Sequence, residues 1–169
     1  HVPAACSSRA VTLPGGSLKQ LGIDVCTGPV VDFRLREHLL QQPQIGSAPL
    51  LYAAHFSGGF AWPRDERKPN AIAMNPCTQS WLMPNGGYVV TLRFSSKEEK
   101  RRIVAHVLPA NALSADWIGF ENHLNVFHCN RRGLPERLAR CLCAYLNSQA
   151  VDDYFRTFSG HTQVNATDL

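Results

Sequence analysis

YVVTLRF, from Tyr88 to Phe94, alternates β-branched and apolar residues. Such a segment is typical of a β-strand that packs against a core. A charged segment around Lys97–Lys100 follows, and RIVAHVL, from Arg102 to Leu108, has the composition of a second strand. We therefore expect these two strands to form a hairpin that is connected through the charged segment.

Further strands are expected on both sides of this hairpin. The candidates are Leu21–Val31, interrupted by a turn at Thr27-Gly28-Pro29, then Pro49–Phe56, Ala71–Trp81 and Leu124–Phe127. Between the first two, Asp32–Leu40 is expected to form a short helix or a bend that ends before Pro43. Glycine and proline clusters separate these segments, as they commonly do between strands.

Two helices are expected late in the chain. Leu134–Asn147 places Leu138, Leu142, Tyr145 and Leu146 on one face at steps of three and four, with Pro135 at its start. Ala150–Phe158 is expected to be a shorter helix that ends near Gly160. Strands first and helices late predict an α+β fold, with a mixed twisted sheet over residues 21–169 and a loop or linker over residues 1–20.

Composition indicates a single folded domain that needs no metal or disulfide. The chain has 169 residues, of which 44% are hydrophobic and 18% are charged. No apolar run reaches the about 18 residues needed to span a membrane, and the first residues do not resemble a signal peptide. Because the chain starts at His1 rather than Met, we expect a fragment of a longer cytoplasmic protein.

Six cysteines are scattered along the chain, and none of them forms a Cys-x-x-Cys pair. We expect reduced thiols rather than disulfides in a cytosolic protein. A zinc site would have to use His128, Cys129, Cys141 and Cys143, whose spacing fits none of the familiar zinc patterns. Free cysteines, and no metal, are therefore the expectation.

Motifs of catalysis are absent from the sequence. It contains no glycine-rich dinucleotide loop, no phosphate-binding loop and no nucleophile elbow. The acidic pairs Glu98-Glu99 and Asp152-Asp153 consist of adjacent residues, whose side chains point apart on a helix or strand. Solvated charge is the simpler interpretation of both pairs.

Basic residues gather in three places. Residues 93–102 carry five basic and two acidic side chains, Arg131, Arg132, Arg137 and Arg140 form a second cluster, and Arg34 and Arg36 form a third. Clustered Lys and Arg can neutralise DNA phosphates and supply affinity that does not depend on sequence. A solvated basic face remains the alternative for each cluster.

Amide and hydroxyl side chains are dense from Phe158 to Thr167, and Asn122–Asn125 forms a smaller polar segment. Asn and Gln can pair with the adenine edge in the major groove, and Ser, Thr and His adapt to several bases. The alternatives are a polar connector for the first segment and local backbone capping for the second.

Several blocks resemble a known family. FSSKEEKRRIVAHV (Phe94–Val107), FENHLNVF (Phe120–Phe127), CTGPVVDFR (Cys26–Arg34), HFSGGFAWPRDERKPNAI (His55–Ile72) and SGHTQVNATDL (Ser159–Leu169) are similar to the C-terminal half of adenine-specific DNA methyltransferases from bacterial type II restriction-modification systems. The resemblance implies a target-recognition domain that binds duplex DNA. More remotely, the chain resembles the recognition domains of type I specificity subunits.

Two hallmarks of that family are missing. The glycine-rich loop that binds S-adenosylmethionine and the Asn-Pro-Pro-Tyr/Phe motif that holds the flipped adenine do not occur, and Met74-Asn75-Pro76-Cys77 lacks the second proline and the aromatic residue. The resemblance therefore implies that this chain binds no cofactor and is not catalytic alone. S-adenosylmethionine is expected in a separate catalytic domain, which would be its partner.

Twelve residues are predicted to bind DNA. Lys97, Lys100, Arg101 and Arg102 are expected to contact the backbone, and His161, Thr162, Gln163 and Asn165 to contact base edges or position the loop, with Arg34, Asn122, His123 and Ser159 beside them. Two alternatives stay open. One is a small metal-dependent hydrolase or nuclease built from His123, His161 and Asp168, and the other is a docking module without direct DNA contact.

Overall fold

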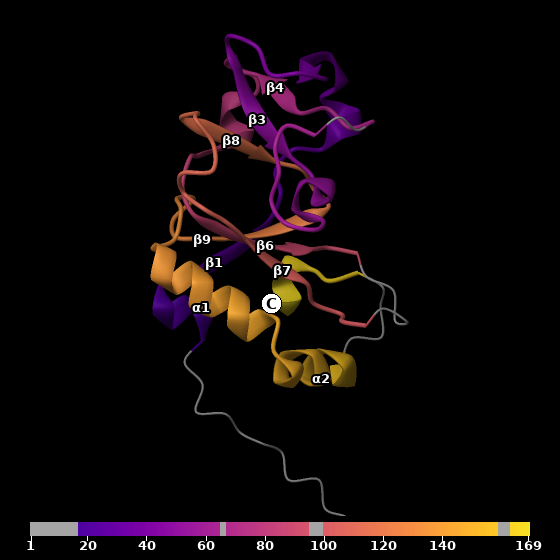
Figure 1. Cartoon of the computed structure of the whole chain (residues 1–169), viewed down its shortest axis with the longest axis vertical. Coiled ribbons are helices and arrows are strands. Elements are labelled where there is room, and N and C mark those ends of the chain that lie inside the picture. Colours follow the sequence, from indigo (N-terminus) through magenta and orange to yellow (C-terminus); the bar gives the residue numbers. More distant parts are fainter. Residues whose placement is uncertain (1–16, 65–66, 95–99, 159–162) are drawn as a thin grey trace, which may run out of the picture.

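The computed structural model describes residues 17–64, 67–94, 100–158 and 163–169, and it confirms the α+β fold (Figure 1). One sheet contains β1 (Asp24–Thr27), β9 (Leu124–His128), β6 (Tyr88–Leu92) and β7 (Ala105–Leu108), in that order and antiparallel throughout. A second sheet contains β2 (Leu39–Leu40), β4 (Ala71–Ala73), β3 (Ser47–Leu51), β8 (Trp117–Phe120) and β5 (Leu82–Pro84). Its pairs are antiparallel except for β3 and β8, which are parallel.

The expected hairpin is confirmed. β6 pairs with β7 in antiparallel register, with Val89 opposite Val107. Both faces of β6 are buried, because Val89 joins a core cluster beneath the helices while Val90 joins the cluster between the two sheets. A strand that packs on two sides needs apolar residues at nearly every position, which explains why Thr91 is the one polar residue in Tyr88–Leu92.

Both late helices are confirmed, as α1 (Glu136–Leu146) and α2 (Gln149–Phe158). α1 packs on β6 and β7 and buries Ala139, Leu142 and Leu146. Tyr145 was expected on the buried face and is instead exposed. The buried stripe is centred on Ala139 and Leu142, and Tyr145 falls at its margin.

Other predicted elements differ in extent. The strand expected over Pro49–Phe56 ends at Leu51, and Ala53–Phe56 forms a short 3₁₀ helix. The strand expected over Ala71–Trp81 ends at Ala73. The remaining 3₁₀ helices of the described residues are Leu18–Leu21, Asp32–Arg34, Arg36–His38, Gln79–Trp81 and Ala166–Asp168. Leu18 packs against the core, so folded structure begins inside the segment expected to be a loop.

None of the helices in the described part of the chain is long and apolar enough to cross a membrane.

The two sheets are joined where two chain segments cross. After β1, the N–H of Gly28 donates to the carbonyl of Leu124 (2.8 Å), and the N–H of Val30 donates to the carbonyl of Phe120 (3.0 Å). Val30 in turn accepts from the N–H of Asn122 (2.9 Å). A Cβ atom at Gly28 would lie 2.2 Å from the carbonyl oxygen of Glu121, so this position has no room for a side chain.

We expect Gly28→Ala to reduce the free energy of unfolding by about 3 kcal/mol, because backbone atoms block the new methyl group. Gly58→Ala is the control, since its Cβ would meet open space and only the left-handed backbone at φ 69° adds strain; the expected loss is about 1–2 kcal/mol. Urea unfolding of both variants makes the comparison. Equal losses would show that the crossing can relax.

A buried carboxylate joins α2 to the segment before β7. Asp152 accepts from the backbone N–H of Arg102 (2.6 Å) and from Nε of Arg156 (2.7 Å). Burial works to raise the pKa of Asp152, but these two hydrogen bonds and the charges of Arg156 and Arg101 bring it below its ordinary value. The ionised carboxylate therefore stabilises the fold.

We expect Asp152→Ala to reduce the free energy of unfolding by about 1–3 kcal/mol at pH 7, since it removes hydrogen bonds to charged groups. Stability that depends on a lowered pKa is present above the carboxyl's ordinary pKa of about 3.9 and is lost as the pH falls through the lowered value. Urea unfolding at pH 7 and pH 3, with exposed Asp153→Ala as the control, should show the deficit shrinking at pH 3. A deficit of the same size at both pH values would contradict this account.

Candidate nucleic-acid interface

Three segments that are distant in sequence meet at one edge of the molecule. They are the start of the β6–β7 connection at Arg93 and Phe94, the β8–β9 turn at Glu121–His123, and the C-terminal segment from Gln163. The N–H of Arg93 donates to the carbonyl of His123 (2.9 Å), and the N–H of Val164 donates to the carbonyl of Arg93 (2.7 Å). In Figure 1 this edge is at the right, where β6 ends and β9 begins.

Arg93 holds the three segments together. Its Nη1 donates to the carbonyl of Asn122 (3.2 Å). In the amide orientation that satisfies both side chains, the oxygen of Gln163 accepts from Nε and Nη2 of Arg93 at 3.1 and 2.6 Å. Asn165 lies beside Gln163, with 2.6 Å between Oδ1 and the amide of Gln163. The structure thus brings together Asn122, Gln163 and Asn165, three of the predicted site residues.

His123 is fixed by a buried carboxylate. Glu121 is only 1% exposed, accepts from the N–H of His123 (3.0 Å) and contacts Nδ1 of the same residue. The imidazole is half-exposed and lies against the ring of Phe94, with 5.1 Å between the ring centres. Glu121 therefore orients a histidine whose Nε2 has no hydrogen-bond partner in the described part of the chain.

A hollow of 280 Å³ opens beside this histidine. It is lined by Tyr52, Ala53, Ala54, Lys68, Leu92, Phe94, Glu121 and His123. Nζ of Lys68 lies over the ring of Tyr52 and 3.0 Å from Oδ2 of Asp32. Burial works to raise the pKa of Asp32, but the hydrogen bond and charge of Lys68 bring it below its ordinary value.

Among the lining residues whose side chains carry a hydrogen-bond donor, Tyr52 is the most buried. Burial raises the pKa of its hydroxyl, and the carboxylates of Asp32 and Glu121 add to the rise. The hydroxyl therefore stays protonated, and it has no hydrogen-bond partner among the described residues.

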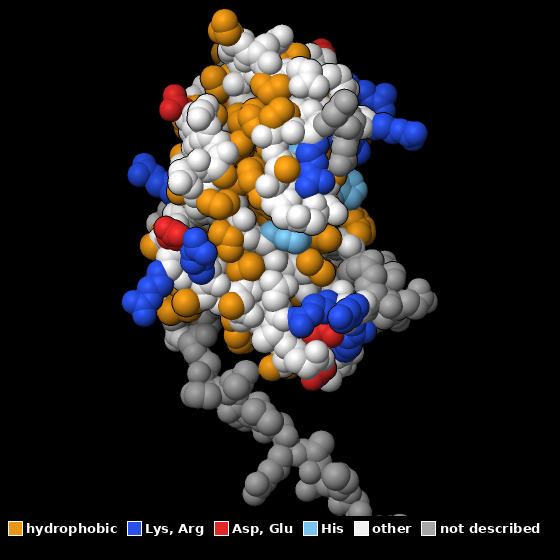
Figure 2. All heavy atoms as spheres, in the orientation of Figure 1, with side chains coloured by type: hydrophobic (Ala, Val, Ile, Leu, Met, Phe, Trp, Pro, Cys, Tyr) orange, Lys and Arg blue, Asp and Glu red, His pale blue; other side chains and the backbone are white. Residues whose placement is uncertain are grey.

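Basic side chains lie on both sides of the hollow. Arg34, Arg36, Arg67 and Lys68 are exposed on the side of the second sheet, and Lys100 and Arg156 are exposed on the side of β7 and α2. Figure 2 shows Lys and Arg side chains gathered in two groups toward this edge, with histidine between them. Arg34 and Lys100, two of the predicted DNA-binding residues, are therefore exposed, and their contact with DNA stays a prediction.

Arg102 was expected to contact the DNA backbone, but it is only 2% exposed and lies over the ring of Phe155. Its neighbour Arg101 is half-buried, and Nη1 of Arg101 is shielded from solvent. The basic run of residues 93–102 extends into the segment that packs against α2, so Arg101 and Arg102 stabilise the fold. We do not keep Arg102 in the interface.

The second basic cluster lies on another side of the molecule. Arg131 donates to the carbonyls of Ser80 and Leu82, and Arg140 pairs with Glu136 on α1. The start of α1 lies at the left of Figure 1, opposite the β8–β9 turn. The second basic cluster and the basic residues beside the hollow therefore do not form one continuous basic surface.

Four predicted residues, Lys97, Ser159, His161 and Thr162, lie outside the described residues. Five residues of the site were not among the twelve predicted DNA-binding residues, namely Tyr52, Lys68, Arg93, Phe94 and Glu121. Arg93 was counted only as one charge in a basic cluster. The sequence indicated the Glu121 and His123 pair only through their spacing in FENH, residues 120–123. A carboxylate two residues before a histidine can reach its ring across a tight turn.

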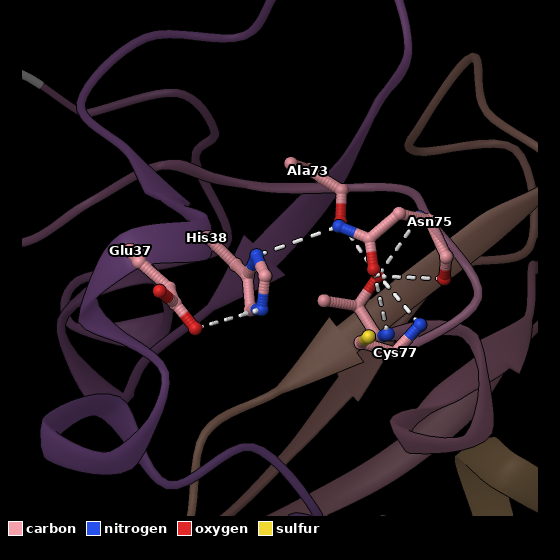
Figure 3. Close-up of polar contacts among 6 residues, drawn as sticks. Glu37, His38, Ala73, Asn75 and Cys77 are labelled. Atoms are coloured by element: carbon pink, nitrogen blue, oxygen red, sulfur yellow. Dashed lines mark hydrogen bonds and ion pairs between the residues drawn. The ribbon is translucent and has the colours of Figure 1, made fainter.

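The side chain of Asn75 has a structural role in the turn Met74-Asn75-Pro76-Cys77. This role explains the asparagine without a catalytic function. Its Oδ1 accepts from the N–H groups of Cys77 (2.9 Å) and Thr78 (3.1 Å), and Oγ1 of Thr78 donates to the carbonyl of Ala73 (2.7 Å). Figure 3 shows this turn, with the ring of His38 beside the Asn75 amide and Glu37 beyond it. This side chain organises the end of β4.

The described residues provide no metal-binding group for the alternative of a metal-dependent hydrolase. Among the described residues, no three His, Cys, Asp or Glu side chains are grouped so that they could hold a metal ion. Asp168 accepts from the N–H of Asn165 (3.0 Å) and so caps the last 3₁₀ helix. The described cysteines, Cys26, Cys77, Cys129, Cys141 and Cys143, are free thiols.

Comparison with known proteins identifies relatives that align with most of this chain. The chain is 56% identical over 154 residues to the type II methyltransferase M.BsuBI of Bacillus subtilis, and 47% identical over 155 residues to the type II methyltransferase M.PstI of Providencia stuartii. No family model and no solved structure matches it. Each alignment covers 90% of this chain but only 31% of the relative. The chain is therefore homologous to about a third of the length of type II methyltransferases.

Proposed function

We propose that this chain is the DNA target-recognition portion of an adenine-specific methyltransferase in a bacterial restriction-modification system, acting in the cytoplasm. One observation carries the proposal. Across 90% of its length the chain is homologous to type II methyltransferases, yet its 169 residues contain neither the S-adenosylmethionine loop nor the Asn-Pro-Pro-Tyr/Phe motif. Methyl transfer and cofactor binding would then belong to the part of the relatives that this chain does not span.

Duplex DNA would lie along the edge that carries the hollow. Arg34 and Lys68 on one side, and Lys100 on the other, would contact the phosphate backbone. Such contacts position a protein on the duplex, while contacts to base edges select the sequence. The β8–β9 turn lies between the two basic groups, so it would face the bases.

Asn122 and His123 are the best placed of the described residues to read base edges. The side-chain amide of Asn122 has no hydrogen-bond partner among the described residues, and an Asn amide can make two hydrogen bonds to adenine. The side-chain oxygen of Gln163 accepts from Arg93, and Asn165 lies beside the Gln163 amide. We therefore assign Gln163 and Asn165 to positioning of the loop.

A separate surface supports interdomain docking as a second role. A groove of 1040 Å³ runs between β1, α1 and the two terminal 3₁₀ helices, lined largely by apolar residues such as Leu21, Leu138 and Tyr145. It shares no residue with the hollow. Docking through this groove and DNA contact through the edge that carries the hollow are therefore compatible.

Titration of the chain with a random duplex at several salt concentrations tests the proposal, with single-stranded DNA and S-adenosylmethionine as comparison ligands. We expect duplex binding that weakens steeply with salt, because phosphate contacts release counterions, and no binding of S-adenosylmethionine. Absence of duplex binding at low salt, or tight binding of S-adenosylmethionine, would contradict the proposed role.

We expect Lys68→Ala and Lys100→Ala each to weaken binding of all duplex sequences alike and to reduce the salt slope by about one unit, as the loss of one phosphate contact does. Arg140→Ala is the matched control, because it removes an exposed charge on α1 while leaving the proposed edge intact. Fluorescence anisotropy at several salt concentrations gives the slopes. If Arg140→Ala changed the slope as much as Lys100→Ala, the DNA would not be confined to this edge.

We expect Asn122→Ala to flatten the preference among duplex sequences, with about 1–3 kcal/mol lost for a bidentate pair, and to leave the salt slope unchanged. Binding selection from a randomised duplex pool, carried out with wild type and variant, measures the preference. A variant that selected the same sequence with the same stringency would remove Asn122 from base readout.

A further inference from the structure

The hollow beside His123 contains a buried donor that the fold leaves unpaired. Tyr52 is 3% exposed, its hydroxyl has no hydrogen-bond partner among the described residues, and it lines the hollow. Burying a hydroxyl without a partner costs free energy. A group that enters the hollow and accepts this hydrogen bond would recover that cost.

One wall of the hollow is aromatic and open to solvent. Phe94 is 47% exposed, and its ring lies against the imidazole of His123, which Glu121 holds in place. The guanidinium of Arg93 lies 5.7 Å from the centre of the Phe94 ring. Exposed aromatic rings held rigidly in this way are suited to stacking on a planar ligand.

The size and chemistry of the hollow restrict what can enter. At 280 Å³ it lies just below the range of about 300–1,000 Å³ that is usual for sites of larger ligands. Ala53, Ala54 and Leu92 make its lining partly apolar, while Tyr52, His123 and Lys68 are lining residues whose side chains carry a hydroxyl, an imidazole and an ammonium group. A single planar heterocycle with polar edge atoms fits this combination.

We propose that the hollow binds one nucleobase that has left the base stack of the duplex, with Phe94 and His123 as its stacking wall and the Tyr52 hydroxyl as a donor to its edge. The inference rests on the proposed function, since the duplex on the basic edge supplies the base. A base outside its stack is accessible to such a site, and DNA pays least for unstacking where the base is already unpaired.

The test compares a fully paired duplex with a duplex that has the same sequence and one extra, unpaired adenine, using fluorescence anisotropy at fixed salt. Wild type should bind the bulged duplex about tenfold more tightly, as expected for one stacked base. Phe94→Ala should abolish this preference, so that the variant binds the paired and the bulged duplex equally. Tyr145→Ala, which removes an exposed aromatic ring from α1, is the control and should keep the preference.

Tyr52→Phe separates a ligand site from a structural defect. It removes only the unpaired hydroxyl, so the Tm should stay the same or rise, while the preference for the bulged duplex should fall severalfold. A lower Tm together with an unchanged preference would mean that the hydroxyl serves the fold and not a base.

The outcomes also distinguish this inference from the proposed function. Equal binding of paired and bulged duplexes, or a preference that persists in Phe94→Ala, would overturn the base site and leave duplex recognition in place. Failure to bind either duplex at low salt would overturn both.

Discussion

The close crossing of Gly28 over Glu121 is the constraint on which the rest of the structure depends. At this point the chain leaves β1 in one sheet and runs beside β8 in the other, and backbone hydrogen bonds from Gly28 and Val30 join the two. The approach is so close that a Cβ atom would overlap the carbonyl of Glu121. The crossing therefore determines how the two sheets meet, and it places the β8–β9 turn at the edge.

The same crossing buries the carboxylate of Glu121 next to its own turn. A buried carboxylate is costly unless it is hydrogen-bonded, and Glu121 meets this requirement through the backbone N–H and Nδ1 of His123. One consequence is that His123 has a defined orientation although it is half-exposed. Arg93 then ties the turn to the C-terminal segment, so a rigid polar edge results from interactions that are themselves largely structural.

Much of the fold could be predicted from the sequence, because periodicity reports which faces are buried. The β6–β7 hairpin and the two late helices follow from alternation and from steps of three and four. β5 and β8 could not be found in this way, since LMP and WIGF are too short to show a period. Tyr145 was misplaced because helix periodicity gives a stripe but does not show where the stripe ends.

The site was harder to predict than the fold. Lys100 in the basic run is exposed, but the run could not show that Arg102, two positions later, is covered by α2. The hollow is built from Tyr52, Phe94 and Glu121, which are far apart in the sequence and carry no shared motif. Only the three-dimensional crossing of the segments brings them together.

The most direct test of the central claim is to map the backbone amide chemical shifts of the chain by NMR while duplex DNA is added. If this edge binds DNA, the amides of Phe94, Asn122, His123 and Gln163 should shift in a saturable way, and those of Arg137 and Arg140 on α1 should not. Shifts confined to α1, or none at all at low salt, would contradict the account.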